Sequence, residues 1–546
     1  MAAEPNQDKK PTTDGGASAS PLLHSLREDT SALAATAAAL MLFTLTAADV
    51  RLWPAAILAP LPLLVVAPEI PRKRAAQFAF GAHLFGYVLR WPAEMAVRSL
   101  PIVLGIHAVE AALFAAFVVL AAEATRRWSG WLATLVYPAL TTAVWFAIGE
   151  MSPDGSYANP AYGAVNLIAL MQVAAYTGLA GVTFLMSLVP AAMAVAWYRQ
   201  RWRMEWKPIA ALPLGIVAFV VLAGALRMIF VGRSPAVKVG VAASDQMRML
   251  FDTQQAPEAA KAIGLYAPLV KQAASDGAQV VVLPEQVVGA TPQFESRVTA
   301  GFAEIARLAG VWLVVGINEN GREPQRNVAL AFSPAGKVVA RYEKRHLISA
   351  IESGYAAGTA PAVFDTPWAR TALAIGKDLD FPGLGREIAA NGATVVLAPA
   401  SDWPGSEVIH ERMAIALGIE SGLSIARAAR RGVVSLTDST GHTLGAGSTF
   451  EHDPALVVAE LPAGVGATFY VRHGDWFGWV SIVLAGIILG FFAILARADR
   501  ARAARRADSI ATDAILAAGD EPAAAAHAPQ AAPEPDELPE VLHYRR

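Results

Sequence analysis

Three polar groups stand at the ends of apolar stretches, where they could meet and perform acid–base chemistry. Glu285 follows the run VVVLP, Lys344 lies in RYEKRHL, and a Gly-Lys-Asp turn at 376–378 follows TALAI. A carboxylate can serve as a general base, and a lysine ammonium can stabilise an oxyanion, if the fold brings the strand ends together. Taken singly, each has an ordinary alternative, because Glu285 could begin a helix and Lys344 could be a solvated charge at a strand end.

The elements that would position these groups lie between residues 231 and 474, where strand-like and helix-like segments alternate. A hairpin is expected across Ala335-Gly336. Helices are expected at 257–277 and 296–309, and apolar strands at 237–244, 278–285, 311–319, 371–375 and 394–400. Short strands that alternate with helices predict an α/β layered domain.

The rest of the chain is strongly apolar. Of its 546 residues 55% are hydrophobic and 16% charged, whereas a soluble domain is about one quarter charged. Long apolar runs fall at 32–48, 52–67, 75–97, 102–122, 131–148, 179–197, 209–230 and 476–496. Most reach the roughly 17–25 residues that span a bilayer, which predicts a polytopic α-helical membrane domain with about eight spans. The second run contains Pro54, Pro60 and Pro62 and could instead be a buried or re-entrant segment.

The distribution of basic residues predicts the orientation of these spans. Lys and Arg gather in alternate loops, and none occurs between 149 and 178; the basic groups lie at 72–74, 126–127, 199–207 and 497–506. Because basic loops stay in the cytoplasm, both termini are expected there and the α/β segment outside. In a Gram-negative cell this places the protein in the inner membrane with a periplasmic domain.

Composition also excludes several kinds of chemistry. The chain has no cysteine, which excludes disulfides, thiolate metal sites and cysteine-based catalysis. A formal net charge of -2 gives no indication of a nucleic-acid partner. The histidines are scattered, and GAGSTF at 445–450 lacks the glycine order of a phosphate loop. We therefore expect no metal and no cofactor.

Together, the motifs resemble the nitrilase, or carbon–nitrogen hydrolase, superfamily. Its signature elements match Leu283-Pro284-Glu285, the Tyr-x-Lys-x-x-Leu stretch 342–347 and the stretch 376–382, which ends in Phe-Pro. The resemblance implies an αββα sandwich with Glu285 as the base, Lys344 as the oxyanion-stabilising cation and Glu352 as a second active-site glutamate. Gly376 occupies the position of the family's nucleophilic cysteine.

With the membrane spans included, the chain most resembles the bacterial apolipoprotein N-acyltransferases. Further matching stretches are HERMAIALGIESGLSIARAARRG at 410–432 and the segment 468–475 that returns to the membrane. The resemblance implies transfer of an acyl chain from a phospholipid to the free amino terminus of a diacylated lipoprotein. In that family a glutamate deprotonates the cysteine, the thiolate attacks the ester, and the lipoprotein amine resolves the resulting thioester.

The apolar runs, the basic loops, the composition of the tails and the resemblance together predict five segments. They are a disordered cytoplasmic N-terminus (1–30), a membrane domain of about seven helices (31–230), a periplasmic nitrilase-like domain (231–474), a last span (475–497) and a disordered cytoplasmic tail (498–546).

Glycine at 376 leaves several functional interpretations open, because it has no side chain that could form a thioester. The amine of Lys377 would leave a stable amide, whereas the hydroxyl of Ser401 could be activated by Glu285. The chain could also be a catalytically impaired pseudoenzyme, or membrane scaffold, that retains the fold. An amidase-like hydrolase acting on a small amide is a further alternative, although a soluble substrate needs no membrane spans.

Three polar features outside these motifs have alternative interpretations. His107 and Glu110 lie three residues apart on one apolar helix, where they could be functional or a hydrogen-bonded pair that fixes packing. Arg90 and Arg227 lie near span ends and are expected to extend toward the interface. The polar stretch 152–163 could border a substrate entrance or be a plain connector.

Overall fold

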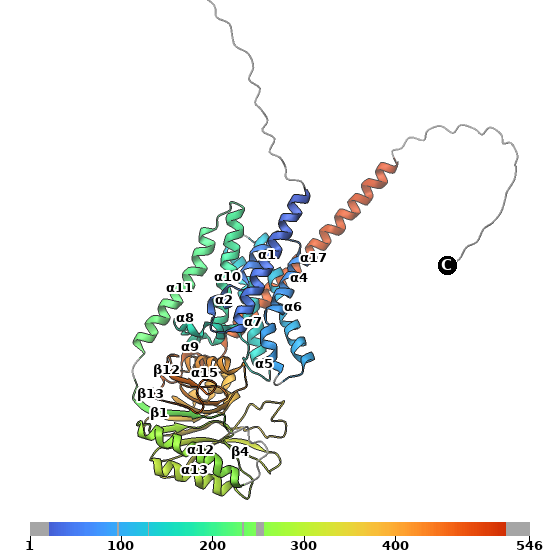
Figure 1. The fold of residues 1–546 in the computed structure, drawn as a ribbon. Helices are drawn as coiled ribbons and strands as arrows, with labels where there is room; N and C mark the ends of the chain where they lie inside the picture. Colours follow the sequence, from blue (N-terminus) through green and yellow to red (C-terminus); the bar gives the residue numbers. More distant parts are fainter. Residues whose placement is uncertain (1–20, 96–97, 129, 232–233, 247–255, 520–546) are drawn as a thin grey trace, which may run out of the picture. The chain divides into compact units, whose positions relative to one another are not determined.

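The computed structural model describes residues 21–95, 98–128, 130–231, 234–246 and 256–519. Its amino-terminal part is a bundle of apolar helices (Figure 1). Among the described residues, six helices are long and apolar enough to cross a membrane. They belong to α1 (Pro21–Ala48), α6 (Leu100–Arg127), η3 with α7 (Trp131–Leu135 and Val136–Met151), α10 (Leu179–Arg201), α11 (Lys207–Phe230) and α17 (Trp476–Gly519).

Two of the eight expected spans are formed by interrupted helices. The run at 52–67 becomes α2 (Trp53–Leu58) and α3 (Leu61–Val66), and a proline stands in the first turn of each. Proline has no N–H to donate and disfavours helical backbone in the residue before it, so the run divides where prolines recur. The run at 75–97 becomes α4 (Arg72–Gly86), η2 (Val88–Arg90) and α5 (Trp91–Met95). Six spans therefore consist of single long helices, and the re-entrant alternative for 52–67 stays open.

Both expected disordered ends are partly helical. The helix α1 begins at Pro21, so residues 21–30 do not belong to a disordered N-terminus. Likewise α17 continues to Gly519, past the expected boundary at 497. Its sequence after that boundary contains mainly alanine and arginine with no internal Gly or Pro, and these are strong helix formers. The remaining parts of the two expected tails, 1–20 and 520–546, lie outside the described residues.

The segment after α11 forms two packed β-sheets. The first sheet has the strand order β13-β1-β2-β4-β5-β6, and β3 pairs with β4. Its strands are β1 (Ala236–Ala243), β2 (Val280–Val282), β3 (Val288–Gly289), β4 (Trp312–Glu319), β5 (Arg326–Phe332), β6 (Val338–Glu343) and β13 (Ala455–Pro462). The second has the order β12-β11-β10-β9-β8-β7. Its strands are β7 (Ala362–Asp365), β8 (Arg370–Leu373), β9 (Val395–Ser401), β10 (Ser424–Arg430), β11 (Val433–Thr437) and β12 (Thr443–Ser448).

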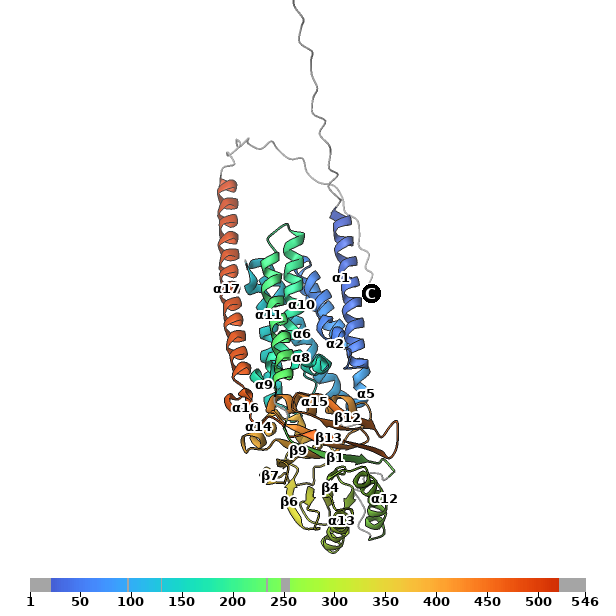
Figure 2. The same cartoon turned by 90° about the vertical axis from the view of Figure 1, so that its left-hand side faces the viewer.

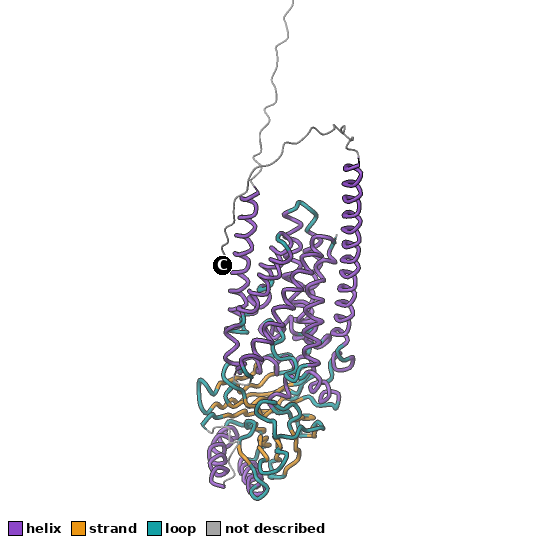
Figure 3. The backbone as a smooth tube through the Cα atoms, turned by 90° about the vertical axis from the view of Figure 1, so that its right-hand side faces the viewer, coloured by secondary structure: helices purple, strands orange, loops and turns teal. Residues whose placement is uncertain are grey.

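Helices cover the outer face of each sheet. The first sheet packs against α12 (Ala256–Ser275) and α13 (Glu295–Ala309). The second packs against α14 (Pro382–Ala390) and α15 (Glu407–Ser421). Along β2, Val281 faces the helices while Val280 and Val282 face the other sheet. Strands buried on both faces are apolar throughout, as the sequence is here. The expected αββα sandwich is confirmed (Figure 3).

The helix α15 also packs against the membrane helices (Figure 2). Its Met413, Ala416 and Ile419 share a core with residues of α8 to α10, while other α15 residues face the second sheet. From α15, the guanidinium of Arg412 donates to the carbonyl oxygens of Tyr162 (2.7 Å) and Gly163 (3.2 Å). Buried carbonyl groups need such donors, so α15 fixes the α/β domain to the end of the bundle.

Glu420, near the end of α15, makes a second contact between the two domains. Its Oε1 accepts a hydrogen bond from the backbone N–H of Leu179, the first residue of α10 (2.6 Å). The side chain is fully buried, and burial raises its pKa to about 8, although the Leu179 N–H and the charge of Arg386 oppose the shift. The folded protein therefore holds a proton on Glu420 at neutral pH.

We expect this proton to make stability fall as pH rises. The folded-state pKa of Glu420 exceeds its unfolded value, so the stabilisation is complete below the unfolded pKa of about 4.5 and is lost as pH rises through about 8. In detergent, the unfolding temperature of the wild type should fall between about pH 5 and pH 9 relative to that of Glu420→Gln, which cannot titrate. At the upper pH the glutamine variant should be the more stable protein. Parallel curves for the two proteins would contradict a protonated Glu420.

Candidate active site

Glu285 lies three residues beyond Val282, where β2 ends. Its backbone N–H donates to the carbonyl of Ala400 in β9 (3.2 Å), which ties the strand end to the second sheet. On the other side, Gly316 of β4 leaves room, because a Cβ there would stand 2.5 Å from the Glu285 Cα. The backbone of Glu285 thus lies between β4 of the first sheet and β9 of the second, and its side chain is buried.

Lys344 directly follows β6 and reaches the same place. Its N–H donates to the Asn327 carbonyl (2.9 Å), which continues the β5–β6 pairing. Its Nζ donates to Glu285 Oε1 (2.8 Å) and to both oxygens of Glu352, at 3.0 Å to Oε2 and 3.2 Å to Oε1. The side chains of all three are at most 5% exposed. The structure therefore brings together the three charged residues that the motifs predicted.

Asn327 of β5 completes this cluster, and sequence analysis did not identify it. Its Nδ2 donates to Glu285 Oε1 (2.6 Å) and to Glu352 Oε1 (2.8 Å). The backbone N–H of Ile348 donates to Glu352 Oε2 (2.7 Å). In sequence, Asn327 is only the polar beginning of the strand NVALAF, a common pattern with no catalytic signal.

The charges in the cluster depend on one another. Burial raises the pKa of Glu285, as does the nearby Glu352, while Lys344 and Asn327 oppose the rise. Burial alone would lower the pKa of Lys344, but the two carboxylates outweigh it and raise that pKa. Lys344 is accordingly a permanent ammonium, and Glu285 is a carboxylate with an increased affinity for a proton. This combination suits a general base beside an oxyanion-stabilising cation.

Gly376 begins η5 (Gly376–Asp380), the turn after β8, and faces this cluster. Its φ of +44° lies in the left-handed region that glycine adopts most easily. An added Cβ would stand 2.6 Å from Glu285 Oε2, the oxygen of that carboxylate for which the structure shows no donor. The position of the expected nucleophile is therefore beside the base, but the chain supplies no side-chain atom there.

Asp378, in the same turn, connects η5 to the loop that carries Lys344. Its Oδ2 accepts from the Tyr342 hydroxyl (2.8 Å) and the Ile375 N–H (3.1 Å). Its Oδ1 accepts from the N–H groups of Arg345 (3.2 Å) and His346 (2.9 Å). The sequence indicated the turn but not this role, which fixes Gly376 relative to Lys344.

The two candidate substitute nucleophiles differ in their surroundings. The Lys377 Nζ donates to Asp154 Oδ1 (2.9 Å) and to the Leu347 carbonyl (3.5 Å), so it is held on the membrane-domain loop. Alternation along β9 places Ser401 on the same face as Val395 and Leu397, which face the first sheet. No described contact joins Ser401 to Glu285, and its activation stays a prediction.

The stretch 152–163 packs on η5. Ser156 donates from its backbone N–H (3.0 Å) and its Oγ (2.7 Å) to the carbonyl of Asp380. Gly155 lies so close that a Cβ there would stand 2.5 Å from the same oxygen. Asp154, which receives Lys377, also pairs with Arg98. The stretch therefore contacts the site directly.

Among the described residues, no group of His, Asp or Glu is arranged to hold a metal ion.

The buried cluster leads to a stability prediction. Lys344→Met should lower the free energy of unfolding by about 3–5 kcal/mol, because it leaves two buried carboxylates without their cation. Adding Glu352→Gln should recover part of this loss by removing one uncompensated charge. Lys238→Met, an exposed lysine of the same domain, should change the free energy by less than about 0.5 kcal/mol. Denaturant unfolding in detergent measures all three, and equal effects of Lys344→Met and Lys238→Met would contradict the charge assignment.

Comparisons with known proteins agree with this arrangement. The family model for the apolipoprotein N-acyltransferase N-terminal domain matches residues 39–192, and that for carbon-nitrogen hydrolase matches residues 241–465. An apolipoprotein N-acyltransferase from Geobacter metallireducens is 23% identical over 474 residues, which cover 80% of this chain and 90% of that protein.

Other relatives match a smaller share of the chain. A deaminated glutathione amidase from Yersinia enterocolitica is 31% identical over 157 residues, which cover 26% of this chain and 55% of the amidase. The crystal structure of an amidase from Nesterenkonia sp. matches with 21% identity and a TM-score of 0.38, covering 45% of this chain and 95% of the amidase. Because a relative with matching membrane and α/β parts spans most of both chains, the chain belongs to the apolipoprotein N-acyltransferase family, within the carbon-nitrogen hydrolase superfamily.

Proposed function

We propose that the chain is a bacterial membrane protein that N-acylates lipoproteins at the Glu285–Lys344–Glu352 cluster. One observation carries the proposal: the Glu285 oxygen that accepts no hydrogen bond in the structure faces residue 376, the position of the missing nucleophile. The family relative supplies the substrate class by its name. The acyl donor would be a membrane phospholipid and the acceptor the free amine of a diacylated lipoprotein.

Without a cysteine, the acceptor amine itself would attack the donor ester. The amine nitrogen, entering uncharged beside Gly376, bonds to the ester carbonyl carbon. Glu285 accepts the proton that this nitrogen loses and returns it to the glycerol oxygen as the carbon–oxygen bond breaks. The products are the amide and a lysophospholipid, so no atom or proton is left over.

Lys344 would stabilise the oxyanion of this reaction. An ammonium has three N–H donors. One donates to Glu285 Oε1, and a second can serve both oxygens of Glu352 as a three-centre hydrogen bond. The third can be directed to a substrate oxygen, and in a water-excluded site such a charge is worth several kcal/mol to the transition state. Glu352 and Asn327 hold the lysine and the base but need not touch the substrate.

The orientation of the membrane domain follows from the same proposal. The α/β domain would lie in the periplasm, with both termini in the cytoplasm, as the basic loops indicate. Both substrates are anchored in the membrane, so a site beside the ends of the spans can reach their ester and amine groups. Contacts between η5 and the loop 152–156 support this position of the site.

A second candidate function is binding of the same substrates without turnover. It is favoured by one observation, the absence of any side chain at Gly376. Loss of a covalent nucleophile lowers the rate of its enzyme by orders of magnitude, although binding and oxyanion stabilisation can survive.

Lipoprotein N-termini from cells depleted of their own N-acyltransferase test the proposal. Expression of the wild-type chain should restore N-acylated termini, as detected by mass spectrometry. Glu285→Gln should abolish this, because the amide cannot accept the proton, and Ser401→Ala should leave it unchanged. Loss with Ser401→Ala would instead identify serine as the nucleophile and contradict direct transfer.

Gly376→Cys is the matched variant for the binding alternative. If only this variant restores acylation, the site is intact and the wild-type chain binds its substrates without turnover. If neither protein restores it while both are expressed and folded, lipoproteins are not the substrate class. The added side chain has to displace the Glu285 carboxylate slightly and adopt a positive φ, which costs about 1–2 kcal/mol, so folding is measured alongside.

A further inference from the structure

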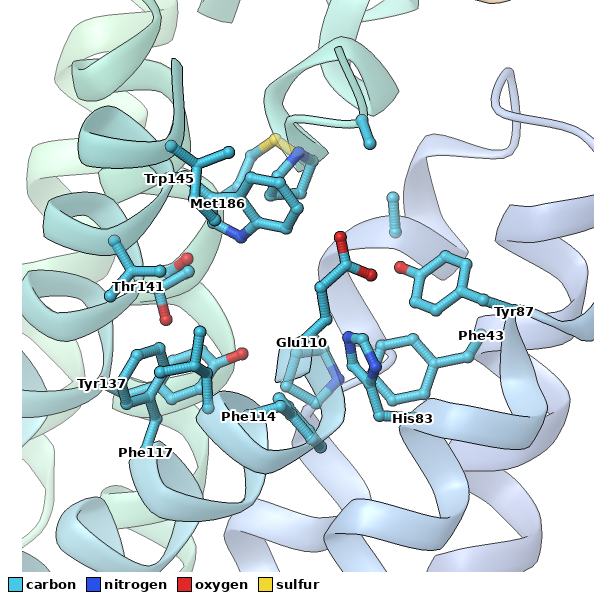
Figure 4. A pocket seen from close by; sticks show the side chains of 18 of the residues that line it. Phe43, His83, Tyr87, Glu110, Phe114, Phe117, Tyr137, Thr141, Trp145 and Met186 are labelled. Carbon is cyan, nitrogen blue, oxygen red and sulfur yellow. The ribbon is translucent and has the colours of Figure 1, made fainter. Parts of the chain in front are cut away.

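A cavity inside the helix bundle takes no part in the catalytic cluster. This inner cavity has a volume of about 90 Å³ and lies among α1, α2, α4, α6, α7 and α10 (Figure 4). Its walls are mainly apolar and aromatic, and they include Phe43, Phe114, Phe117, Trp145, Ile148 and Met186. None of Glu285, Lys344, Glu352 and Gly376 lines it. At about 10–15 Å³ for each water-sized group, it has room for roughly half a dozen of them.

One end of the inner cavity is polar. His83 is 7% exposed, and its Nδ1 has no hydrogen-bond partner. The side chains of Tyr87 and Glu110 lie beside it (Figure 4). Glu110 is already engaged, because its Oε2 and the Glu94 Oε2 each lie 3.1 Å from a different ring nitrogen of His107. The expected His107–Glu110 pair is thereby confirmed, while His83 Nδ1 and Thr141 Oγ1 are wall atoms without a hydrogen-bond partner among the described residues.

A second, larger cavity adjoins the first. This outer cavity has a volume of about 300 Å³ and shares the wall residues Ala56, Tyr87, Arg90, Ala158 and Pro160 with the inner one. Its other wall residues are more polar and come from the end of α1, the loop after α7 and the beginning of α15. Together the two cavities form a space with an apolar end among the spans and a polar end beside the α/β domain.

Arg90 stands at the junction of the two cavities. Its guanidinium lies 5.5 Å from the centre of the Tyr87 ring and 6.0 Å from that of Tyr157. In the part of the chain that the structure describes, no ion pair joins Arg90 to a carboxylate, and Glu94 and Glu110 are bound to His107. A guanidinium without a carboxylate partner, in a cavity with aromatic walls, can bind a phosphate.

We propose that these cavities bind one glycerophospholipid, with its phosphate on Arg90. A segment of one acyl chain would fill the inner cavity, and the rest of the head group would occupy the outer cavity. The polarity of the space matches that of a lipid, because the apolar end lies among the spans and the charged end lies where the α/β domain begins. This site goes beyond the proposed acyl transfer, since none of the four catalytic-cluster positions lines either cavity.

The position of this lipid would give it an effect on η5. Tyr157, Ala158 and Asn159 line the outer cavity. The three residues before them hold η5 through Lys377 and the Asp380 carbonyl. A lipid in the outer cavity would therefore support, from the opposite side, the loop that packs on η5.

Lipid retention tests the site directly. Wild-type protein, washed extensively in detergent, should keep one phospholipid per chain in native mass spectra. Arg90→Gln should retain at least about tenfold less, which corresponds to the loss of one charge-assisted contact. Arg227→Gln, at the end of another span, and Glu285→Gln, in the catalytic cluster, should retain as much as the wild type. Absence of bound lipid from the wild type, or equal retention by Arg90→Gln and Arg227→Gln, would overturn the proposal.

The cysteine-free chain permits a second measurement. Ser187 lines the inner cavity, so Ser187→Cys reports its occupancy through the rate of labelling by N-ethylmaleimide. Added dioleoyl phosphatidylethanolamine should slow labelling in detergent micelles, and Arg90→Gln should remove this protection. Ser481→Cys, which is also buried (2% exposed, against 8% for Ser187) but lies outside the cavity, should show no protection. Equal protection by inorganic phosphate would show a phosphate site without a lipid. Because neither measurement requires turnover, failed acylation by the wild type would leave this test intact.

Discussion

One buried ammonium shared between two carboxylates constrains the whole α/β domain. Lys344, Glu285 and Glu352 come from three separate strand ends or loops, and each is costly to bury without the others. The cluster is therefore stable only when β2, β5, β6 and the loop after β6 take these positions together. The two sheets must also meet at this place, because the Glu285 N–H donates to β9 and Gly376 follows β8. Because a buried charge without its partner costs several kcal/mol, packings that separate these three side chains are strongly disfavoured.

This constraint extends to the membrane helices through the turn η5 (Gly376–Asp380). Asp378 fixes η5 to the lysine loop, while Lys377 and the Asp380 carbonyl fix it to the loop after α7. Charged contacts at the turn and the Arg412 contacts of α15 lie on the same side of the domain as the spans. A displacement of the domain on the bundle would consequently disturb the site as well as the interface.

The sequence predicted the parts of this arrangement that depend on local pattern. Apolar strands ending in Glu285, Lys344 and Gly376 gave the site, because strand ends converge in a layered fold. The same local patterns gave the sandwich and most spans. They could not predict Asn327, because its role depends on the register of β5 beside β4 and β6. Nor could they predict the hydrogen bonds of Asp154 and Ser156 to η5, which lies over 220 residues away in sequence. The prolines of the second run had already indicated an interruption there, whereas the apolarity of the third run concealed the irregular turns that divide it.

The backbone conformation at residue 376 is one that glycine adopts more easily than cysteine does. A cysteine in that position would need a positive φ and would press on the Glu285 carboxylate, whereas glycine adopts the same turn without strain. The surrounding contacts of the turn are made by its backbone and by Asp378, so they do not depend on a side chain at 376. What the glycine leaves is a small space bordered by a base with a free oxygen and, through it, by a cation. An uncharged amine is a group of suitable size and polarity for that space, since it can donate to the carboxylate while its lone pair faces an ester. The geometry consequently favours a site in which the second substrate supplies the atom that the chain lacks.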